Sequence, residues 1–446
     1  MTMHRVTGYV VVVAAVLAFR PLAAQAVTLE ECIRTALEEN PDARAAEYRV
    51  TAARAAIREA QSAFYPVVTL SSALNRTDNP PQAFMMSLNQ RSLNMADPAF
   101  NPNEPDDTEN LRMSAGAKVR LLDGGQRSLG RQMAGLGAEA SKEGLRAVQN
   151  NLIYQVVYGY YSVLQASAFV AVQQETVQSL EESLRVAEEH FKAGTTFKTD
   201  VLNLEVKLAQ AREDLIRARN GLKLATVALN TAIGRDVVDA EHLPAPVSAA
   251  MPAPPSTENE DAVENRPELA AAKKVAAIKE KAAVKSARDY APVLNAFGSM
   301  DWDSDVSSDF EQSYMVGLML EWDVFTGFRR GAATAGARAE LEAARAEEQK
   351  ARNQLRLDLK QAFLQATEAW ERLAVAGKSV ESAKEALRIT QERYAQGAAD
   401  ITDLLTAQVG LTATQTRNVA AQYDYLSALA NYERAQGGLV KTYVPD

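Results

Sequence analysis

The chain repeats its own pattern once, and this restricts the fold to a duplicated unit. Val380 follows Val177 by 203 residues, and both begin the same spacing: Val177-x-Ser179-x-x-Glu182-x-Leu184-Arg185 and Val380-x-Ser382-x-x-Glu385-x-Leu387-Arg388. The register holds from about residue 113 to about residue 230, and it pairs Gly124 with Gly327 and Arg127 with Arg330. Solenoid repeats are only about 20–50 residues long, so this period indicates one duplicated structural unit.

The register between the copies changes once, which locates an insertion. Phe64-Tyr65-Pro66 and Tyr290-Ala291-Pro292 lie 226 residues apart, so the first copy carries 23 additional residues (226 − 203). They fall within residues 77–110, which are rich in Pro, Asn, Asp and Ser and predict a long solvated loop. We expect a first repeat at 27–243, a Pro-rich linker at 244–267, a second repeat at 268–438 and a C-terminal tail at 439–446.

The N-terminus predicts a secretory signal peptide over residues 1–26. Arg5 precedes the apolar run 9–19, and Ala24-Gln25-Ala26 is a small-x-small cleavage site. The run is too short to span a bilayer of about 30 Å, although a short N-terminal anchor is the alternative. We do not expect a lipid on Cys32, because glutamates occupy the two preceding positions where small residues would be needed.

Each copy contains two predicted strands in which apolar and polar residues alternate. The clearest are residues 111–121 and 314–324, and the weaker ones are 67–76 and 294–302. Strands of about 9–11 residues with one apolar face are typical of membrane-spanning β-barrels, although soluble sandwiches alternate in the same way. We expect lipid on the apolar face, with these candidates: Leu111, Met113, Val119, Leu121, Leu318, Leu320 and Trp322.

The remaining sequence predicts unusually long helices. No proline occurs between Pro105 and Pro244 or between Pro292 and Pro445, and an interior proline would break a helix. Residues 127–193 would form one helix near 100 Å long at about 1.5 Å per residue, and two helices at 29–64 and 198–233 would match it end to end. Heptad spacing around the turn at Gly194 predicts a coiled coil, although an ordinary soluble bundle shows similar spacing.

The composition argues against an enzyme and against a nucleic-acid-binding protein. Without residues 1–26 the chain carries 46 basic and 57 acidic residues, a net charge near −11, and phosphate binding needs clustered basic side chains. One cysteine and three histidines are too few for a disulfide framework or a Cys/His zinc site. We therefore expect no cofactor and no metal, and a solvated helix position for His190.

Three motifs resemble those of the TolC-like outer-membrane efflux protein family. They are Leu29-Glu30-Glu31-Cys32-Ile33 with Asn40-Pro41, then Leu122-Asp123-Gly124-Gly125-Gln126-Arg127, and the duplicated turns Phe191-x-x-Gly194 to Asp200-Val201-Leu202 and Tyr394-x-x-Gly397 to Asp403-Leu404-Leu405. The resemblance implies a mainly α protein with a small β part. Each protomer would supply four transmembrane strands, and a homotrimer would complete a 12-stranded outer-membrane barrel continuous with a periplasmic helical barrel.

The resemblance also implies a function and a set of sites. The protein would export substrates from the periplasm, or directly from an inner-membrane pump, in a tripartite efflux or type I secretion system. The turns would dock a periplasmic adaptor protein through Gly194, Thr195, Thr196, Gly397, Ala398 and Ala399. Asp200 and Asp403 would line the periplasmic aperture, although helix capping is an alternative role for both. A soluble periplasmic coiled-coil adaptor is the alternative for the whole chain.

Overall fold

The computed structural model describes residues 27–96, 101–235, 251–257, 259–305 and 309–443. The predicted signal peptide lies outside these ranges, as do residues 236–243 of the predicted first repeat, 244–250 and 258 of the predicted linker, and 444–446 of the predicted tail. The elements of the first repeat are α1 (Leu29–Glu39), α2 (Pro41–Ser62), β1 (Val67–Thr77), α3 (Pro80–Asn89), β2 (Thr108–Leu122), α4 (Gln126–Lys192) and α5 (Lys198–Ile233). Those of the second are α6 (Pro267–Ala287), η2 (Arg288–Tyr290), β3 (Val293–Ser304), β4 (Glu311–Glu321), α7 (Arg329–Ala395) and α8 (Ile401–Ala435). The predicted linker contains the short helix η1 (Glu260–Asn265), and the predicted tail contains α9 (Leu439–Tyr443).

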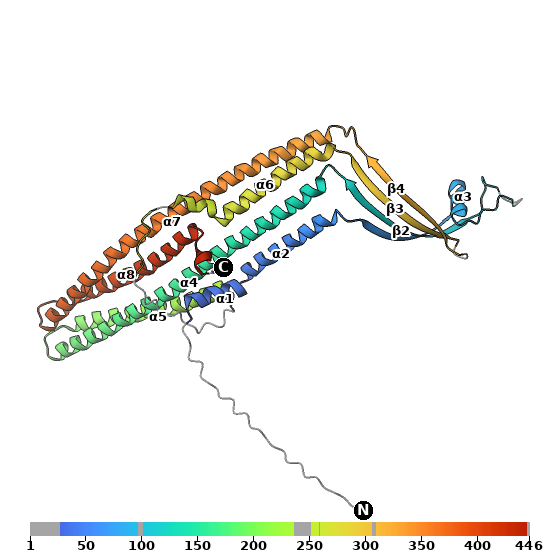
Figure 1. Ribbon diagram of the computed structural model, residues 1–446. Coiled ribbons are helices and arrows are strands. Elements are labelled where there is room, and N and C mark those ends of the chain that lie inside the picture. Colours follow the sequence, from blue (N-terminus) through green and yellow to red (C-terminus); the bar gives the residue numbers. More distant parts are fainter. Residues whose placement is uncertain (1–26, 97–100, 236–250, 258, 306–308, 444–446) are drawn as a thin grey trace, which may run out of the picture.

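The molecule is elongated, with a helical wall at one end and a four-stranded sheet at the other (Figure 1). The helices α4 and α7 contain 67 residues each, which gives them a length of about 100 Å. Near the sheet the helices are ordered α2, α4, α6, α7, and near the turns they are ordered α5, α4, α8, α7. The mainly α fold class with a small antiparallel sheet is confirmed. The predicted helix after the turn, 198–233, is α5.

The helix predicted over residues 29–64 is wrong, because the chain breaks at Asn40. Pro41 has no N–H and disfavours helical backbone in the residue before it, and Asn40 is extended, with φ −64° and ψ 129°. Its side-chain oxygen accepts a hydrogen bond from the Asp42 N–H at 2.8 Å. Asn40 therefore ends α1 and caps α2, and α1 turns aside to pack on α4 and α5.

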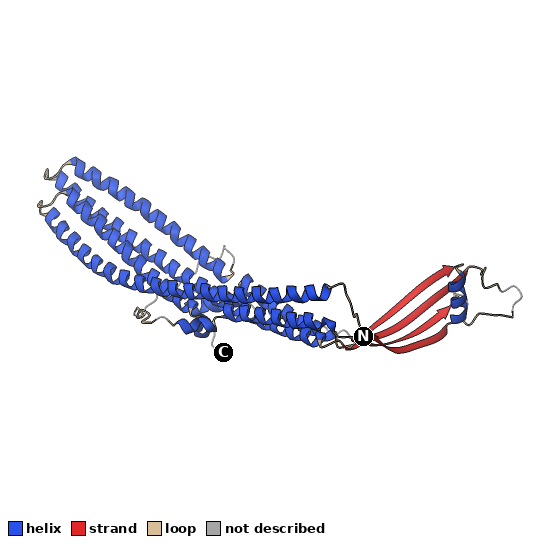
Figure 2. Cartoon of the chain, turned by 90° about the horizontal axis from the view of Figure 1, so that it is seen from above, coloured by secondary structure: helices blue, strands red, loops and turns tan. Residues whose placement is uncertain are grey.

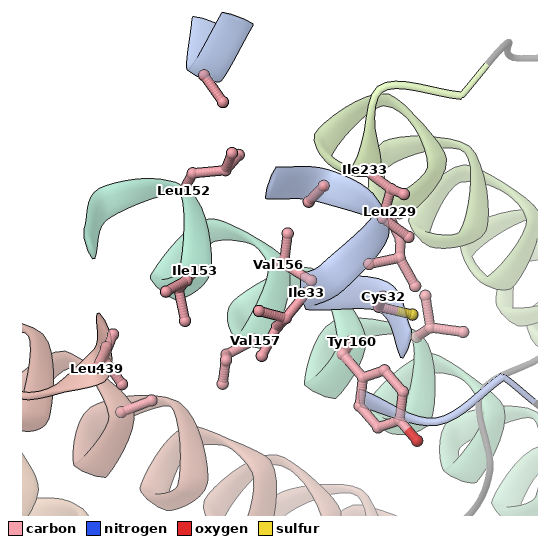
Figure 3. Packing of buried hydrophobic residues seen from close by; sticks show 14 of the residues in the cluster. Cys32, Ile33, Leu152, Ile153, Val156, Val157, Tyr160, Leu229, Ile233 and Leu439 are labelled. Carbon is pink, nitrogen blue, oxygen red and sulfur yellow. The ribbon is translucent and has the colours of Figure 1, made fainter. Parts of the chain in front are cut away.

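A hydrophobic core fills the middle of the molecule, where α1, α4, α5, α8 and α9 meet. Figure 3 shows Cys32 and Ile33 of α1 packed against Val156 and Tyr160 of α4. These side chains are at most 2% exposed. No helix within the described ranges is both long enough and apolar enough to cross a membrane.

We expect Cys32 to be unreactive in the folded protein. Its side chain is 2% exposed, and burial raises the pKa of the thiol from its ordinary value of 9.0 to about 11. A maleimide should therefore label Cys32 at pH 8 only after denaturant is added, because the thiolate is the reactive form. Rapid labelling of the native protein would contradict this packing. The stability of the fold should also fall as the pH rises from 9.0 towards 11, because in this range the thiol of Cys32 ionises in the unfolded chain but stays neutral in the folded one.

Candidate functional site: the sheet faces and the helical turns

The sheet is antiparallel throughout, in the order β1-β2-β3-β4. Residues that pair across antiparallel strands project to the same face, so the register assigns every side chain. One face is apolar and holds Val68, Leu70, Leu74, Leu111, Met113, Val119, Met300, Trp302, Tyr314, Val316, Leu318 and Leu320. The other face is mainly polar and holds Thr69, Ser71, Asn75, Asn110, Arg112, Ser114, Lys118, Asn295, Ser299, Asp301, Asp303, Glu311 and Ser313.

Five of the predicted lipid-facing residues share the apolar face, and two lie elsewhere. Leu121 falls where the register shifts between Arg120 and Leu122, so Leu122 is the residue that pairs with Leu294. Trp322 follows the last residue of β4, and its indole N–H donates to the carbonyl of Tyr290 at 3.1 Å. Alternation alone could not place these two residues, because a bulge and a strand end both interrupt the period of two.

Hydrogen bonds to two aspartates of β3 connect it to β2 across the polar face. Asp303 is 1% exposed and accepts hydrogen bonds from Arg112 at 2.8 Å and from Asn110 at 2.6 Å. Ser114 donates to Asp301 one row nearer the helices. Closer still to the helices, an open hollow of about 740 Å³ is lined by Lys118, Arg120 and other residues of this face. The polar face can therefore border water at this hollow.

The repeated Arg127 and Arg330 fix the joints between sheet and helices. Each stacks on an aromatic residue that lies three residues before the first strand of its repeat: the guanidinium of Arg127 lies 4.9 Å from the Phe64 ring, and that of Arg330 lies 5.4 Å from the Tyr290 ring. Arg127 also donates to Asp123 at 2.9 Å. Gly124 has φ +64°, and a Cβ there would lie 2.6 Å from the Cβ of Ala291. The sequence identified these residues as repeated but did not reveal their contacts.

Aromatic side chains are exposed around the same joints. Tyr65, Trp322, Phe325 and Phe328 are 59–82% exposed, and the rings of Phe325 and Phe328 pack edge to face with their centroids 5.4 Å apart. Aromatic residues of this kind collect where a membrane surface meets water. They lie at the boundary between the sheet and the helical wall.

The two helical turns end the molecule opposite the sheet. Gly194 and Gly397 have φ of +74° and +69°, a left-handed conformation that glycine adopts without steric cost. The flanking residues Thr195, Ala398 and the half-buried Thr196 and Ala399 complete the turns. All six predicted docking residues therefore lie at this end, and their contact with a partner stays a prediction.

The turns are joined by an aromatic contact that the sequence analysis missed. His190 is half-buried rather than solvated, and its ring stacks on that of Tyr394, with centroids 6.0 Å apart and planes at 13°. Tyr394 is 6% exposed. Burial, followed by the negative charge of Asp200, raises the pKa of its phenol.

The two predicted aperture aspartates have different surroundings. Asp200 is half-buried in the first turn of α5, and it accepts a hydrogen bond from Thr196 at 2.6 Å. Asp403 is exposed, and the cap of α8 is Asp400, whose carboxylate accepts from the Asp403 N–H at 2.8 Å. Capping therefore does not require the Asp403 side chain. Within the described ranges, no group of three or more His, Cys, Asp or Glu residues is arranged to hold a metal ion.

A family profile matches most of the chain. Residues 32–235 and 259–438 match the family described as outer membrane efflux protein. The chain belongs to the outer membrane efflux protein family. Membership in this family places the protein in the outer membrane of a Gram-negative bacterium.

Individual members of the family are only distantly similar to the chain. The outer membrane efflux protein BepC of Brucella suis is 24% identical over 292 residues, covering 65% of this chain and 64% of BepC. The alkaline protease secretion protein AprF of Pseudomonas aeruginosa is 25% identical over 301 residues, covering 65% of this chain and 62% of AprF. The chain thus spans 62–64% of the length of these relatives. The outer-membrane channel OprN shares the fold, with a TM-score of 0.78, 21% identity, and coverage of 92% of this chain and 90% of OprN.

Proposed function

We propose that the protein is a homotrimeric outer-membrane channel that exports solutes or polypeptides. The proposal rests on the sheet, which has one apolar face, one mainly polar face and, within the described ranges, unpaired edges at β1 and β4. Exposed edges must be covered or paired, and four strands cannot enclose a pore. Three copies would close a 12-stranded barrel with lipid outside and water inside.

The helical wall would continue this pore into the periplasm. The turns at Gly194 and Gly397 would form its far end, where a periplasmic adaptor would connect it to an inner-membrane pump. Family membership supports these partners, and the names of BepC and AprF associate the family with both efflux and protein secretion. We assign no catalytic activity to the chain. The transported substrate would be whatever the pump delivers.

Two neighbouring residues of β4 provide a test of the barrel. Val316 lies midway along β4 on the apolar face, and Met315 lies beside it on the opposite face. We expect Val316→Lys to prevent recovery of the trimer from the outer membrane, because a lysine facing the bilayer midplane costs about 2–4 kcal/mol per protomer. Met315→Lys should assemble normally and retain channel activity in planar bilayers.

The measurements are the yield of heat-modifiable trimer in the outer-membrane fraction and the conductance after reconstitution. Equal assembly of both variants would contradict the assignment of the faces. Recovery of the protein without either substitution in the soluble periplasmic fraction would instead favour the coiled-coil adaptor.

A further inference from the structure

The insertion in the first repeat contains a helix that crosses the outer end of the sheet. The prediction of a loop over residues 77–110 is wrong for Pro80–Asn89, which form α3. This helix begins three residues after β1 ends and contacts both β2 and β4. Ten residues of helix extend about 15 Å, close to three strand spacings of about 4.8 Å. Figure 2 shows α3 lying across the strands at the end farthest from the helical wall.

Hydrogen bonds hold α3 on the polar face. Gln90 follows the last helical residue and is 7% exposed. Its amide nitrogen donates to the carbonyl of Glu109 at 2.7 Å and to the side chain of Asn110 at 2.9 Å. Asn110 in turn donates to Asp303, which also binds Arg112. The end of α3 is thus joined to a buried network that links β2 and β3.

An ion pair extends this attachment to the last strand. Arg91 lies 3.0 Å from Glu311, which pairs with Asp303 in the sheet register and therefore lies on the same polar face. Arg91 has φ +52°, and its N–H donates to the carbonyl of Leu88 at 3.1 Å. The chain therefore turns sharply after α3, and that turn places Arg91 beside β4.

The side of α3 that faces away from the sheet is apolar. Ala83 and Gln90 lie seven residues apart, on one side of the helix, and both are buried. Met85 and Leu88 lie on the opposite side and are 54% and 42% exposed. The second repeat lacks the insertion, so each protomer would contribute one such helix.

We infer that α3 narrows the outer mouth of the channel and limits which solutes pass. This inference rests on the proposed function, because only a closed barrel turns the polar face into a lumen. Three copies of α3 would then lie across the exit, with three pairs of Met85 and Leu88 directed into the pore. Apolar constrictions oppose the passage of water and ions, so this ring sets the size and polarity of the solutes that leave.

The test measures access from outside the cell to a cysteine inside the lumen. Ser299→Cys places a thiol on the polar face below α3, beside the hollow at Lys118. Asn103→Cys places one in the exposed part of the same insertion. Whole cells are treated with a polyethylene-glycol maleimide that does not cross the outer membrane. The buried Cys32 gives no background.

Two kinds of variant test α3: one removes the helix, and the other breaks its ion pair with β4. The first replaces residues 80–91 with a glycine-serine linker of equal length, and we expect Ser299→Cys to be labelled about tenfold faster or more in this background. The second uses the ion pair and leaves the helix intact. Arg91→Glu and Glu311→Arg should each accelerate labelling, and the combined exchange should restore slow labelling by re-forming the pair.

The outcomes separate this inference from the proposed function. Fast labelling of Asn103→Cys with slow labelling of Ser299→Cys, relieved by both kinds of variant, supports the constriction. Equal labelling of Ser299→Cys with and without α3, and no response to the charge exchange, overturns it while leaving the channel intact. Failure to label Asn103→Cys from outside overturns both the constriction and the proposed channel, because the insertion would then not lie on the outer surface.

Discussion

Replacement of Arg266 by alanine should lower the free energy of unfolding by about 2–3 kcal/mol, because three partners would lose the hydrogen bonds that a buried guanidinium donates. Arg266 is 1% exposed. Its guanidinium donates to Glu268 at 2.8 Å, to Asp358 at 3.3 Å and to the carbonyl of Ala435 at 2.6 Å. The side chain thus ties the start of α6 to α7 and to the end of α8, at the middle of the helical wall. Unfolding of the detergent-solubilised protein in guanidinium chloride, monitored by circular dichroism, measures this decrease in the free energy of unfolding.

The first repeat supplies the matched control. Asn40 precedes Pro41 as Arg266 precedes Pro267, and its amide donates to the carbonyl of Ala232 at 2.9 Å, the counterpart of Ala435. Asn40→Ala removes a neutral cap and one hydrogen bond and should cost only about 1–2 kcal/mol. Arg266→Asn should recover part of the loss by restoring the bond to Ala435. Equal effects of Asn40→Ala and Arg266→Ala would contradict the role of the buried charge.

Replacement of Asp403 by alanine should reduce the preference for cations in planar bilayers, and it should raise single-channel conductance if the smaller side chains widen the aperture. A trimer would place three exposed Asp403 carboxylates around the axis at the periplasmic end. A ring of like charge concentrates cations and excludes anions, so its removal should lower the cation-to-anion permeability ratio by about tenfold. The change in reversal potential in a salt gradient measures this ratio.

Asp400 is the control for Asp403. Asp400→Asn keeps a side chain that can cap α8 while removing one negative charge three residues away. Asp403→Asn should shift selectivity strongly and Asp400→Asn only weakly, with similar thermal stability for the two proteins. Unchanged conductance and selectivity in Asp403→Ala would exclude Asp403 from the aperture.

Long periodic features were predictable because they depend on local rules. The absence of proline between Pro105 and Pro244 predicted one helix over 127–193, and α4 extends from Gln126 to Lys192. The period of two identified all four strands, because apolar residues recur at alternate positions on one face of each. The duplication paired Arg127 with Arg330, and both make the same aromatic contact.

Local exceptions to these rules were not predictable from periodicity alone. The short helix α3 begins with two prolines and contains no charged residue. It lies within an insertion rich in Pro, Asn, Asp and Ser, so the composition of the whole insertion predicted a loop, and its contact with the polar face stabilises it. The bulge at Leu121 shifts the register without changing the alternation of residue types around it. The stacking of His190 on Tyr394 joins helices about 200 residues apart in the chain, and no local pattern predicts such a contact.

The sequence by itself determined the duplicated architecture, the lengths of the helices and the two-faced strands. Each follows from interactions within a few residues: helical hydrogen bonding, alternation of side chains along a strand, and the backbone limits of proline and glycine. The tertiary structure alone decided which residues meet. It placed α3 over the polar face, brought Arg266 to the end of α8 and set Tyr394 beside Asp200. Such contacts depend on the packing of segments distant in the chain, where burial and charge act between residues whose spacing in sequence carries no signal.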